Sequence, residues 1–490
     1  MSTIPPFRHG TPWDDGRPRE ECGVVGIFDF ADAAAHTALG LHALQHRGQE
    51  AAGIVSCDGH QFFAHRDMGV VGDIFASEAV MRRLAGHAAI GHVRYSTSGD
   101  TVLRNVQPLF ADLHLGGFAL AHNGNLTNAL ALRRELVRRG ALFQSTSDTE
   151  VIVHLMAHSD GNSTVDRLAD ALRQIEGAYS LVAMTDSCVI GVRDPLGVRP
   201  LVIGRLDDAH FIASETCALD IVGASFVRDV EAGEMVVLDK SGIHSLRPFA
   251  PARRRFCIFE YIYFARPDSI LEGASVYERR KRIGMELARE SGVPADIIVP
   301  VPDSGVPAAI GYAEAAGIPF DLGIIRNHYV GRTFIEPAQQ IRNLGVKLKH
   351  NANRASLAGK RVVLVDDSIV RGTTSIKIVE MVRAAGATQV HMRIAAPPTA
   401  HSCFYGIDTP KESELLASRM DVPAMTTHIG VDSLAFISTD GLYRAMGETG
   451  RDPDHPQYCD ACFTGDYPTT LTDASDRDEP AQLSLLAELG

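Results

Sequence analysis

The chain of 490 residues lacks an apolar run long enough to cross a bilayer, so a membrane-spanning helix is not expected. Its first 21 residues contain four prolines and mixed charges, but no hydrophobic stretch of the kind that a secretory signal needs. Basic residues are outnumbered, and the formal net charge of −13 at pH 7 argues against nucleic acid as a partner. These absences favour a cytoplasmic protein that binds neither nucleic acid nor membrane.

Cysteine is also scarce, with 8 residues spread widely through the chain. Without a secretory signal, this distribution argues against a disulfide framework and favours reduced thiols or metal ligands. Cys459 and Cys462 form a C-x-x-C pair, which alone could be half of a zinc site or a redox pair. Cys57, Cys188 and Cys217 lie in apolar surroundings, and we predict that they are core residues.

A chain of this length is expected to form about two or three domains, each with its own core. The composition changes sharply at Cys22, from a polar, proline-rich leader to an apolar strand-like run at 22–28, and residues 248–255 form a polar linker. We therefore predict four segments, which are a propeptide-like leader at 1–21, a first domain at 22–250, a second domain at 251–468 and an acidic, flexible tail at 469–490.

The usual glycine-rich nucleotide loops are missing, since the chain has neither G-x-x-x-x-G-K-[ST] nor G-x-G-x-x-G. In their place, a continuous apolar run at 362–365 predicts a strand buried on both faces, and it ends at Asp366 and Asp367. A loop of Gly, Thr, Thr and Ser at 372–375 then opens a helix, an arrangement that suits a phosphate group. The carboxylates would suit sugar hydroxyls or Mg²⁺ beside it, whereas a lone acidic turn would be plain structure.

This order of elements resembles the signature of type I phosphoribosyltransferases, which use phosphoribosyl pyrophosphate (PRPP). The resemblance implies a doubly wound parallel sheet in which Asp366 and Asp367 hold the ribose hydroxyls and Mg²⁺. It assigns the 5-phosphate to Arg371, Gly372, Thr373, Thr374 and Ser375.

A second strand-like run ends in a turn at 302–305, which resembles the pyrophosphate-binding loop of the same family. The resemblance assigns Ser304 to the pyrophosphate and Mg²⁺, and Arg326 and Lys349 to the pyrophosphate. The last two residues belong to a basic segment at 326–350 without apolar periodicity. Such a segment is either a plain surface loop or a lid over the ligand, and the neighbouring motifs favour a lid.

Polar residues of the first half suit the recognition and hydrolysis of an amino-acid amide. Arg94 and Asp148 have the charges that hold an α-carboxylate and an α-ammonium group. Asn123 and Gly124 offer donors for an oxyanion, and Cys22 offers a nucleophile, although alone it would be a buried apolar residue. No histidine is obviously placed as its base, so the α-amine of Cys22 would serve if the leader were removed.

Four motifs surround these residues, namely His-Arg-Gly-Gln at 46–49, His-Val-Arg-Tyr-Ser-Thr at 92–97, His-Asn-Gly-Asn at 122–125 and Ser-Asp-Thr-Glu at 147–150. Together with Cys22 they resemble the N-terminal-nucleophile glutaminases of class II amidotransferases. The resemblance implies a four-layer αββα domain that hydrolyses glutamine.

The whole pattern, over residues 22 to about 468, resembles the glutamine PRPP amidotransferase family, in the branch with a cleaved propeptide. That branch carries a [4Fe–4S] cluster, and its ligand contexts match Cys257, Cys403, Cys459 and Cys462. The resemblance implies conversion of glutamine and Mg-PRPP to 5-phosphoribosylamine, glutamate and pyrophosphate, the first committed step of purine synthesis. It also implies purine-nucleotide inhibitors and a homo-oligomer, by family habit a tetramer.

Two other functions would explain part of the chain. A different class II amidotransferase, such as glucosamine-6-phosphate synthase, would explain the first half but not the signature at 362–375. A non-enzymatic regulator that binds PRPP would leave Cys22, Arg94, Asn123 and Asp148 unexplained.

Overall fold

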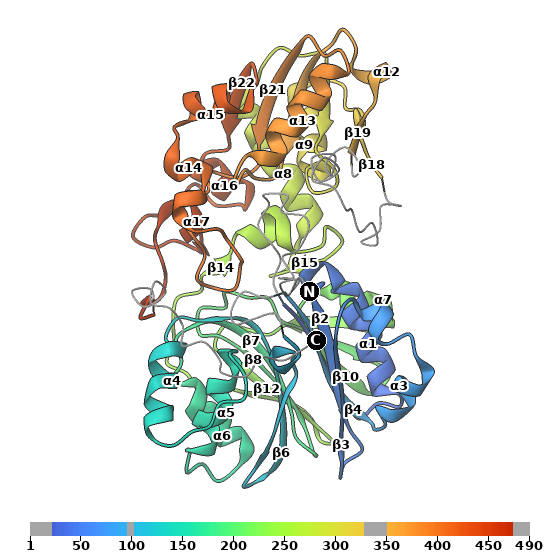
Figure 1. Cartoon of the computed structure of the whole chain (residues 1–490), viewed down its shortest axis with the longest axis vertical. Coiled ribbons are helices and arrows are strands. Elements are labelled where there is room, and N and C mark those ends of the chain that lie inside the picture. The colour runs from blue at the N-terminus through green and yellow to red at the C-terminus, as the bar shows by residue number, and fades with distance from the viewer. Residues whose placement is uncertain (1–21, 96–101, 328–349, 474–490) are drawn as a thin grey trace, which may run out of the picture.

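The protein, described here as a computed structural model over residues 22–95, 102–327 and 350–473, forms two lobes along its long axis (Figure 1). The predicted leader at 1–21, Lys349 and residues 474–490 of the predicted tail lie outside the described residues. Within the described ranges, no helix combines the length and the apolar character that crossing a membrane requires.

The N-terminal lobe begins with a seven-stranded antiparallel sheet in the order β11-β9-β10-β1-β4-β2-β3. Its strands are β1 (Gly23–Phe28), β2 (Ala51–Cys57), β3 (Phe62–Met68), β4 (Ala88–Arg94), β9 (Val202–Leu206), β10 (Ala209–Ala213) and β11 (Ser225–Asp229). Strands β1, β2 and β4 are buried along their whole length. Both faces of this sheet are therefore covered, which explains why these strands have few alternating polar residues.

A second, six-stranded antiparallel sheet has the order β13-β12-β8-β7-β6-β5. Its strands are β5 (Leu109–Leu113), β6 (Gly116–Leu126), β7 (Gly177–Met184), β8 (Val189–Arg193), β12 (Met235–Asp239) and β13 (Gly242–Leu246). The two sheets pack closely at Gly26, where an added Cβ would lie 2.5 Å from Cγ1 of Val182.

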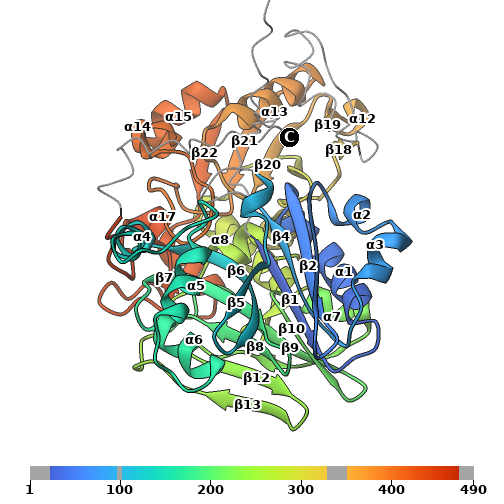
Figure 2. The same cartoon turned by 60° about the horizontal axis from the view of Figure 1, so that its bottom comes forward.

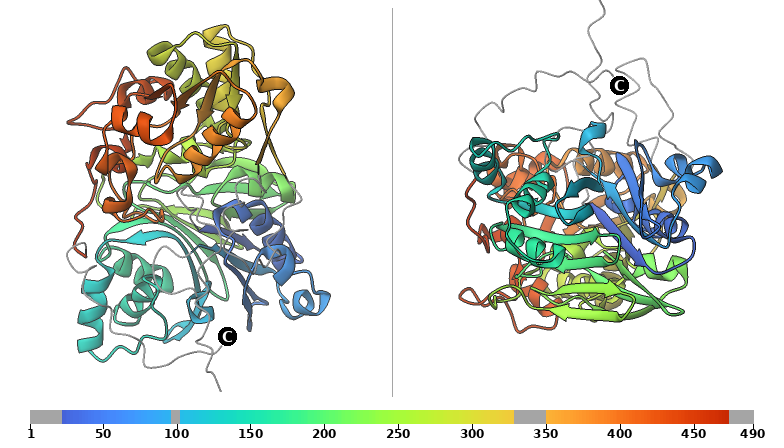
Figure 3. Two further views of the ribbon diagram at one scale, coloured as in Figure 1. Left: turned by 45° about the horizontal axis from the view of Figure 1, so that its top comes forward. Right: turned by 90° about the horizontal axis from the view of Figure 1, so that it is seen from below.

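Helices cover the outer face of each sheet, so the lobe has four layers (Figures 2 and 3). Beside the first sheet lie α1 (Ala33–Ala43), α2 (Val71–Ile74), α3 (Glu78–Arg83) and α7 (Thr216–Val222), with the short turn η1 (Gln45–Arg47). Beside the second lie α4 (Ala129–Arg138), α5 (Thr149–Ala157) and α6 (Thr164–Leu172), and η2 (Leu103–Asn105) precedes β5. The predicted αββα domain is confirmed.

The C-terminal lobe contains a parallel sheet in the order β17-β20-β21-β22. Its strands are β17 (Ile297–Pro300), β20 (Arg361–Asp366), β21 (Gln389–Ile394) and β22 (Ser433–Phe436). Its helices are α8 (Val276–Ser291), α9 (Val306–Ala316), α12 (Arg354–Leu357), α13 (Thr373–Ala384), α14 (Leu416–Arg419), α15 (Val422–Ile429) and α16 (Thr439–Ala445), with η4 (Glu412–Glu414). The predicted doubly wound parallel sheet is confirmed, because α8 and α9 pack together and α13 and α15 form another pair.

Short elements complete this lobe. They are β14 (Phe256–Cys257), η3 (Glu260–Phe264), β15 (Ile270–Leu271), β16 (Ala274–Ser275), β18 (Ile324–Arg326), β19 (His350–Ala352), β23 (Tyr458–Cys459) and α17 (Ala461–Thr464). Strands β14 and β23 pair in parallel, so the last part of the lobe returns to its beginning.

Two features of this lobe differ from what local sequence suggests. α8 carries many basic residues, as an exposed helix would, but Arg280 is 3% exposed and donates to the carbonyls of Tyr261 and Ala265 at 3.0 and 2.7 Å. The flexible tail was expected from residue 469, but Asp473 is buried and accepts from the N–H of Leu130 at 2.7 Å. A carboxylate at the amino end of α4 is stabilised by the helix dipole, which keeps this segment on the N-terminal lobe.

Candidate active sites

Cys22 lies at the beginning of β1, next to a small cavity of the N-terminal lobe. Strand β4 pairs beside it, with Gly23 opposite Val93, and this register brings Arg94 close to Cys22. The cavity is lined by Cys22, Arg94, Tyr95, Gln107, His122, Gly124, Ser147 and Asp148. Four of the five glutaminase residues predicted from the sequence therefore meet in one place.

The Cys22 thiol is held in its neutral form by its surroundings. Burial raises its pKa to about 11, even though a backbone hydrogen bond with Tyr95 and the charge of Arg94 act in the opposite direction. The thiol also lies 3.5 Å from the carbonyl oxygen of Tyr95, to which it can donate while it is protonated. Since the thiolate is the nucleophile, a base must take the proton before Cys22 can attack.

Arg94 is positioned by the glycine of the His-Arg-Gly-Gln motif. A Cβ on Gly48 would lie 2.7 Å from the backbone N and C atoms of Arg94, so only glycine lets the turn after α1 pack there. The Arg94 guanidinium is buried and donates to the carbonyl of Asn105. Its place at the cavity is thus fixed from the backbone and from the side chain.

Gly124 presents its N–H on the same side of β6 as the N–H groups of His122 and Leu126, which are bound by residues that line the cavity. The N–H of His122 donates to Gln107 Oε1 at 2.7 Å, and the N–H of Leu126 donates to Asp148 Oδ2 at 3.0 Å. Because N–H groups two residues apart point to the same edge of a strand, the N–H of Gly124 lies between them. It faces the cavity that Cys22 lines, as an oxyanion donor must.

Asn123 is adjacent to Gly124 but does not line the cavity. Its side chain is fully buried, and neither its amide N nor its amide O has a hydrogen-bond partner among the described residues. Buried amides are almost always paired, so the Asn123 amide is an exception among the buried polar groups of β6.

The sequence analysis missed His122 as a residue of this cavity. Its Nδ1 lies 3.1 Å from Thr149 Oγ1 and 3.8 Å from Asp148 Oδ1, and burial lowers its pKa below the usual value. Gln107, Tyr95 and Ser147 were missed as well. All but Gln107 stand beside a predicted residue in the sequence, and that adjacency was the one signal available.

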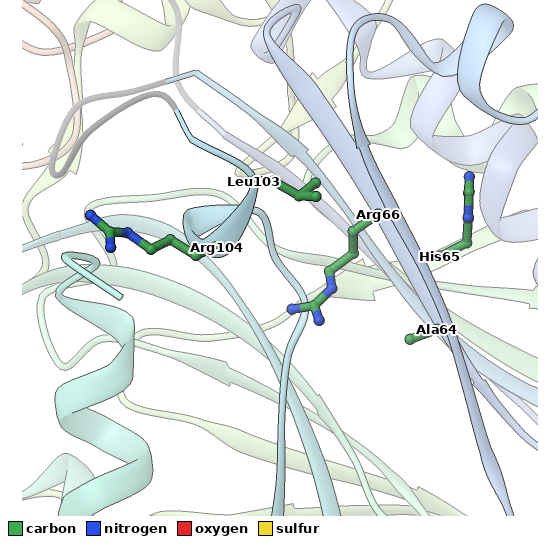
Figure 4. Close-up of a pocket in the computed structure, with 5 residues that line it drawn as sticks. All are labelled: Ala64, His65, Arg66, Leu103 and Arg104. Carbon is green, nitrogen blue, oxygen red and sulfur yellow. The ribbon is translucent and has the colours of Figure 1, made fainter. Parts of the chain in front are cut away.

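A second and more open hollow is lined by Ala64, His65, Arg66, Leu103 and Arg104 (Figure 4). His65 points from β3 toward Phe75, with the ring centroids 5.8 Å apart, whereas Arg66 extends to the other side of the strand. These side chains do not converge on one point as those around Cys22 do.

The predicted PRPP residues lie where β17 and β20 end side by side. Ser304, which follows β17, donates its hydroxyl to Asp367, which follows β20. Asp366 and Asp367 are both buried, and Ser368 Oγ donates to Asp367 Oδ1 at 2.7 Å. The close approach depends on Gly305, since a Cβ there would lie 2.5 Å from the Val365 carbonyl oxygen. These groups lie at the carboxyl ends of the parallel strands, where such folds bind ligands.

The basic residues predicted for this site are paired with carboxylates. Arg326 ends β18 and forms an ion pair with Asp303 of the turn before α9. Arg371 precedes α13, and its Nη2 lies 2.8 Å from Glu414 Oε2. Gly372 caps α13 in the left-handed conformation, with φ of 79°, and Thr373, Thr374 and Ser375 form the first turn of this helix. Lys349 lies outside the described residues.

Cys257, Cys403, Cys459 and Cys462 come from three separate parts of the chain to the lobe junction. Cys257 and Cys459 are register partners of β14 and β23, and the Cys462 carbonyl accepts from the N–H groups of Ala400 and His401 at 3.1 Å. Burial and the other thiols of the group raise the pKa of Cys462 well above its usual value. The remaining cysteines, Cys57, Cys188 and Cys217, are buried core residues as predicted.

Comparison with known proteins covers both lobes. Residues 92–220 match a glutamine amidotransferase domain, and residues 269–403 match a phosphoribosyl transferase domain. The amidophosphoribosyltransferase of Rhizobium etli is 59% identical over 490 residues, which is 99% of either chain. That of Bacillus subtilis is 50% identical over 92% of this chain and 95% of its own.

The fold agrees with a solved structure as well. The glutamine PRPP amidotransferase from B. subtilis, complexed with ADP and GMP, superposes with a TM-score of 0.87 at 49% identity. The match covers 92% of this chain and 98% of that one. Sequence, domain order and fold agree over nearly the full length, and the chain belongs to the amidophosphoribosyltransferase family.

Proposed function

We propose that this protein hydrolyses glutamine in its N-terminal lobe and transfers the ammonia, inside the protein, to C1 of PRPP in its C-terminal lobe. The products are 5-phosphoribosylamine, glutamate and pyrophosphate, in the first committed step of purine synthesis. The observation that carries the proposal is the presence of two separate constellations in one chain. Cys22, Arg94 and Asp148 line one cavity in the N-terminal lobe. In the C-terminal lobe, Ser304 donates a hydrogen bond to Asp367 at the carboxyl ends of the parallel strands.

In glutamine hydrolysis, Cys22 attacks the side-chain amide and forms a thioester. Arg94 pairs with the α-carboxylate and Asp148 with the α-ammonium group, which orients the amide carbon toward the sulfur. The N–H of Gly124 and the unpartnered amide of Asn123 donate to the oxyanion. With the leader at 1–21 removed, the α-amine of Cys22 takes the thiol proton, which the peptide nitrogen of an uncut chain cannot do.

In the synthase step, the main task is to position PRPP and neutralise its charge. Asp366 and Asp367 hold the ribose hydroxyls. The 5-phosphate binds at the amino end of α13, where free N–H groups and hydroxyls converge. The residues of that cradle are Arg371, Gly372, Thr373, Thr374 and Ser375. Ser304, Arg326 and Lys349 bind the pyrophosphate. When PRPP binds, its phosphates replace Asp303 and Glu414 as the partners of Arg326 and Arg371.

Mg²⁺ fits the carboxyl ends of β17 and β20, because Ser304, Asp366 and Asp367 present the oxygen ligands that it prefers there. No three acidic, histidine or cysteine side chains among the described residues converge as ligands of one ion, so substrate oxygens would complete the coordination. The ion would neutralise the pyrophosphate as it leaves.

A [4Fe–4S] cluster fits the group formed by Cys257, Cys403, Cys459 and Cys462. Each thiolate of such a cluster binds a different iron, so the sulfurs stand farther apart than the ligands of a single zinc ion. The four thiols lie near one another, since the register of β14 and β23 pairs Cys257 with Cys459, and the thiols of Cys257, Cys403 and Cys459 help to raise the pKa of Cys462. Burial raises the pKa values of Cys459 and Cys462, and bound iron would stabilise their thiolates, so that the thiol protons would pass to solvent as the cluster binds.

Purine nucleotides are the proposed inhibitors, in keeping with the relative that was solved with ADP and GMP. A homo-oligomer, by family habit a tetramer, and a cytoplasmic location are part of the same proposal.

Measuring phosphoribosylamine formation from PRPP tests the function, with glutamine and with free ammonia as separate nitrogen sources. Both sources should support synthesis, and only glutamine should yield glutamate. If glutamine were hydrolysed without any PRPP-dependent product, the second half of the proposal would be wrong.

A further inference from the structure

We infer that a loop of the C-terminal lobe, residues 404–406, positions the oxyanion donor of the N-terminal lobe. In this arrangement Gly406 is a positioning residue for glutamine hydrolysis. The inference rests on the proposed function, because it assumes that the N–H of Gly124 stabilises the oxyanion.

The two glycines touch through their backbones. A Cβ on Gly406 would lie 2.9 Å from Cα, 3.0 Å from C and 3.2 Å from O of Gly124. On the Gly124 side, an added Cβ would lie 2.0 Å from the carbonyl oxygen of Ala178 in β7. Neither residue has room for a side chain, so the backbone of Gly124, the residue that carries the proposed donor, is packed between β7 and the loop.

The loop is also hydrogen-bonded to the N-terminal lobe at two successive carbonyls. Nδ2 of Asn125 donates to the Phe404 carbonyl at 2.9 Å. Nε and Nη2 of Arg199 donate to the Tyr405 carbonyl at 2.9 and 2.6 Å, and this guanidinium is fully buried. Asn125 is the residue after Gly124, so the same loop contacts β6 at two consecutive positions.

The loop is also held within its own, C-terminal lobe. Tyr405 is 1% exposed, and its hydroxyl lies 3.0 Å from Thr469 Oγ1. The N–H of Cys403 donates to Thr409 Oγ1 at 2.7 Å. A loop fixed at both ends cannot shift freely, so its contact with Gly124 limits where the donor can move.

An oxyanion donor acts in the transition state, and its position should therefore affect turnover more than substrate binding. The residues proposed to bind glutamine lie on other elements, Arg94 at the end of β4 and Asp148 just before α5. Displacing Gly124 should lower kcat for glutamine hydrolysis and leave KM for glutamine nearly unchanged.

The test compares Gly406→Ala with Gly386→Ala in the protein that begins at Cys22 and retains both lobes. Gly386 has φ of 101° and Gly406 has φ of 107°, so both substitutions impose similar backbone strain on the same lobe. A Cβ on Gly386, however, meets only Ala358, at 3.3 Å. Glutaminase kcat and KM, ammonia-dependent synthesis and the rate of Cys22 alkylation by iodoacetamide are measured for both variants.

For Gly406→Ala we expect glutaminase kcat to fall about 10- to 100-fold. We expect KM for glutamine within about twofold of the parent, normal alkylation and normal ammonia-dependent synthesis. Gly386→Ala should retain all four. An unchanged kcat in Gly406→Ala, or an equal fall in both variants, would overturn the inference.

Asn125→Ala provides an independent test if Gly406→Ala does not fold. It removes the bond to Phe404 without adding volume, and kcat should fall about 3- to 10-fold with KM unchanged. An effect on KM alone would contradict the inference. Failure of the proposed function is recognised separately, because the parent protein would then lack glutamine-dependent synthesis altogether.

Discussion

Nη2 of Arg47 in the N-terminal lobe lies 2.7 Å from Oε2 of Glu260 in the C-terminal lobe, and both side chains are fully buried. Glu215 also accepts from Arg47, and Arg199 lies 3.4 Å from Glu260. Although burial acts in the opposite direction, Arg47 and His46 lower the pKa of Glu215 below its usual value. The Glu215 carboxylate is thus charged at neutral pH, and a buried network of arginines and carboxylates joins the two lobes.

Removing one charge of this network should destabilise the protein. Glu260→Gln leaves Arg47 without a full counter-charge inside the lobe junction, and we expect the free energy of unfolding to fall by about 3–5 kcal/mol. Glu78→Gln is the control, because Glu78 and Arg82 form an exposed ion pair worth under about 1 kcal/mol. Denaturant unfolding of both variants measures the difference, and equal midpoints would contradict this role.

Cys22→Ala should separate the two reactions. Without a nucleophile, glutamine-dependent synthesis should fall by about 10³-fold or more. Synthesis from free ammonia should remain, because the PRPP residues are in the other lobe. Parallel assays with the two nitrogen sources measure this, and a folded variant that had lost both activities would argue against two separate sites.

Asp367→Ala should impair synthesis from glutamine and from ammonia alike, by about 10²-fold, because both nitrogen sources need a correctly positioned PRPP. Asp296→Asn is the control, since Asp296 pairs with Arg361 at the opposite end of β20 and is exposed. Steady-state kinetics with PRPP varied provide the measurement. An Asp367→Ala variant with normal ammonia-dependent rates and normal PRPP affinity would remove this residue from the site.

Most of the fold could be predicted because its signals are local. Apolar runs identified β1 and β20. The acidic and hydroxyl residues that follow β20 identified its carboxyl end, at Asp366 and Asp367. The Asn-Gly pair at 123–124 is typical of a turn, and that interpretation is wrong here, because the pair lies inside the long strand β6.

Contacts between distant segments could not be predicted in this way. Nothing in the sequence near Arg280 indicates that its buried guanidinium will donate to the backbone carbonyls of Tyr261 and Ala265. The contact between Gly124 and Gly406 joins residues far apart in the chain, and either glycine alone is compatible with an ordinary turn. Such pairings depend on how the lobes pack, which local patterns do not determine.

The cysteine group predicts a measurable cofactor. Protein purified without oxygen should be brown, with broad absorbance near roughly 400 nm from thiolate-bound iron and sulfide. Cys403→Ser should lose this absorbance and unfold about 5–10 °C lower, because the cluster would tie the two ends of the C-terminal lobe together. Cys57→Ala, a buried cysteine outside the group, should keep the colour. A colourless protein that contains zinc would refute this assignment.

The pKa of Cys22 leads to a prediction about the leader. In the uncut chain, burial raises the thiol pKa to about 11, so only about one molecule in 10⁴ carries the thiolate at pH 7. A raised thiol pKa means that reactivity increases with pH. The rate of alkylation by iodoacetamide should therefore rise about tenfold per pH unit from 7 to 10 in the uncut chain. Cys22→Ala supplies the background from the other cysteines.

A chain that begins at Cys22 should behave differently, because its α-amine, with a reference pKa near 8, can accept the thiol proton. Such a chain can be made by replacing residues 1–21 with a removable tag. Its glutaminase rate should rise as the α-amine loses its own proton and then level off above about pH 8, whereas the uncut chain should use ammonia but not glutamine. Intact-mass measurement identifies the active species. Normal glutamine turnover by a chain that still carries Met1 would exclude the α-amine as the base.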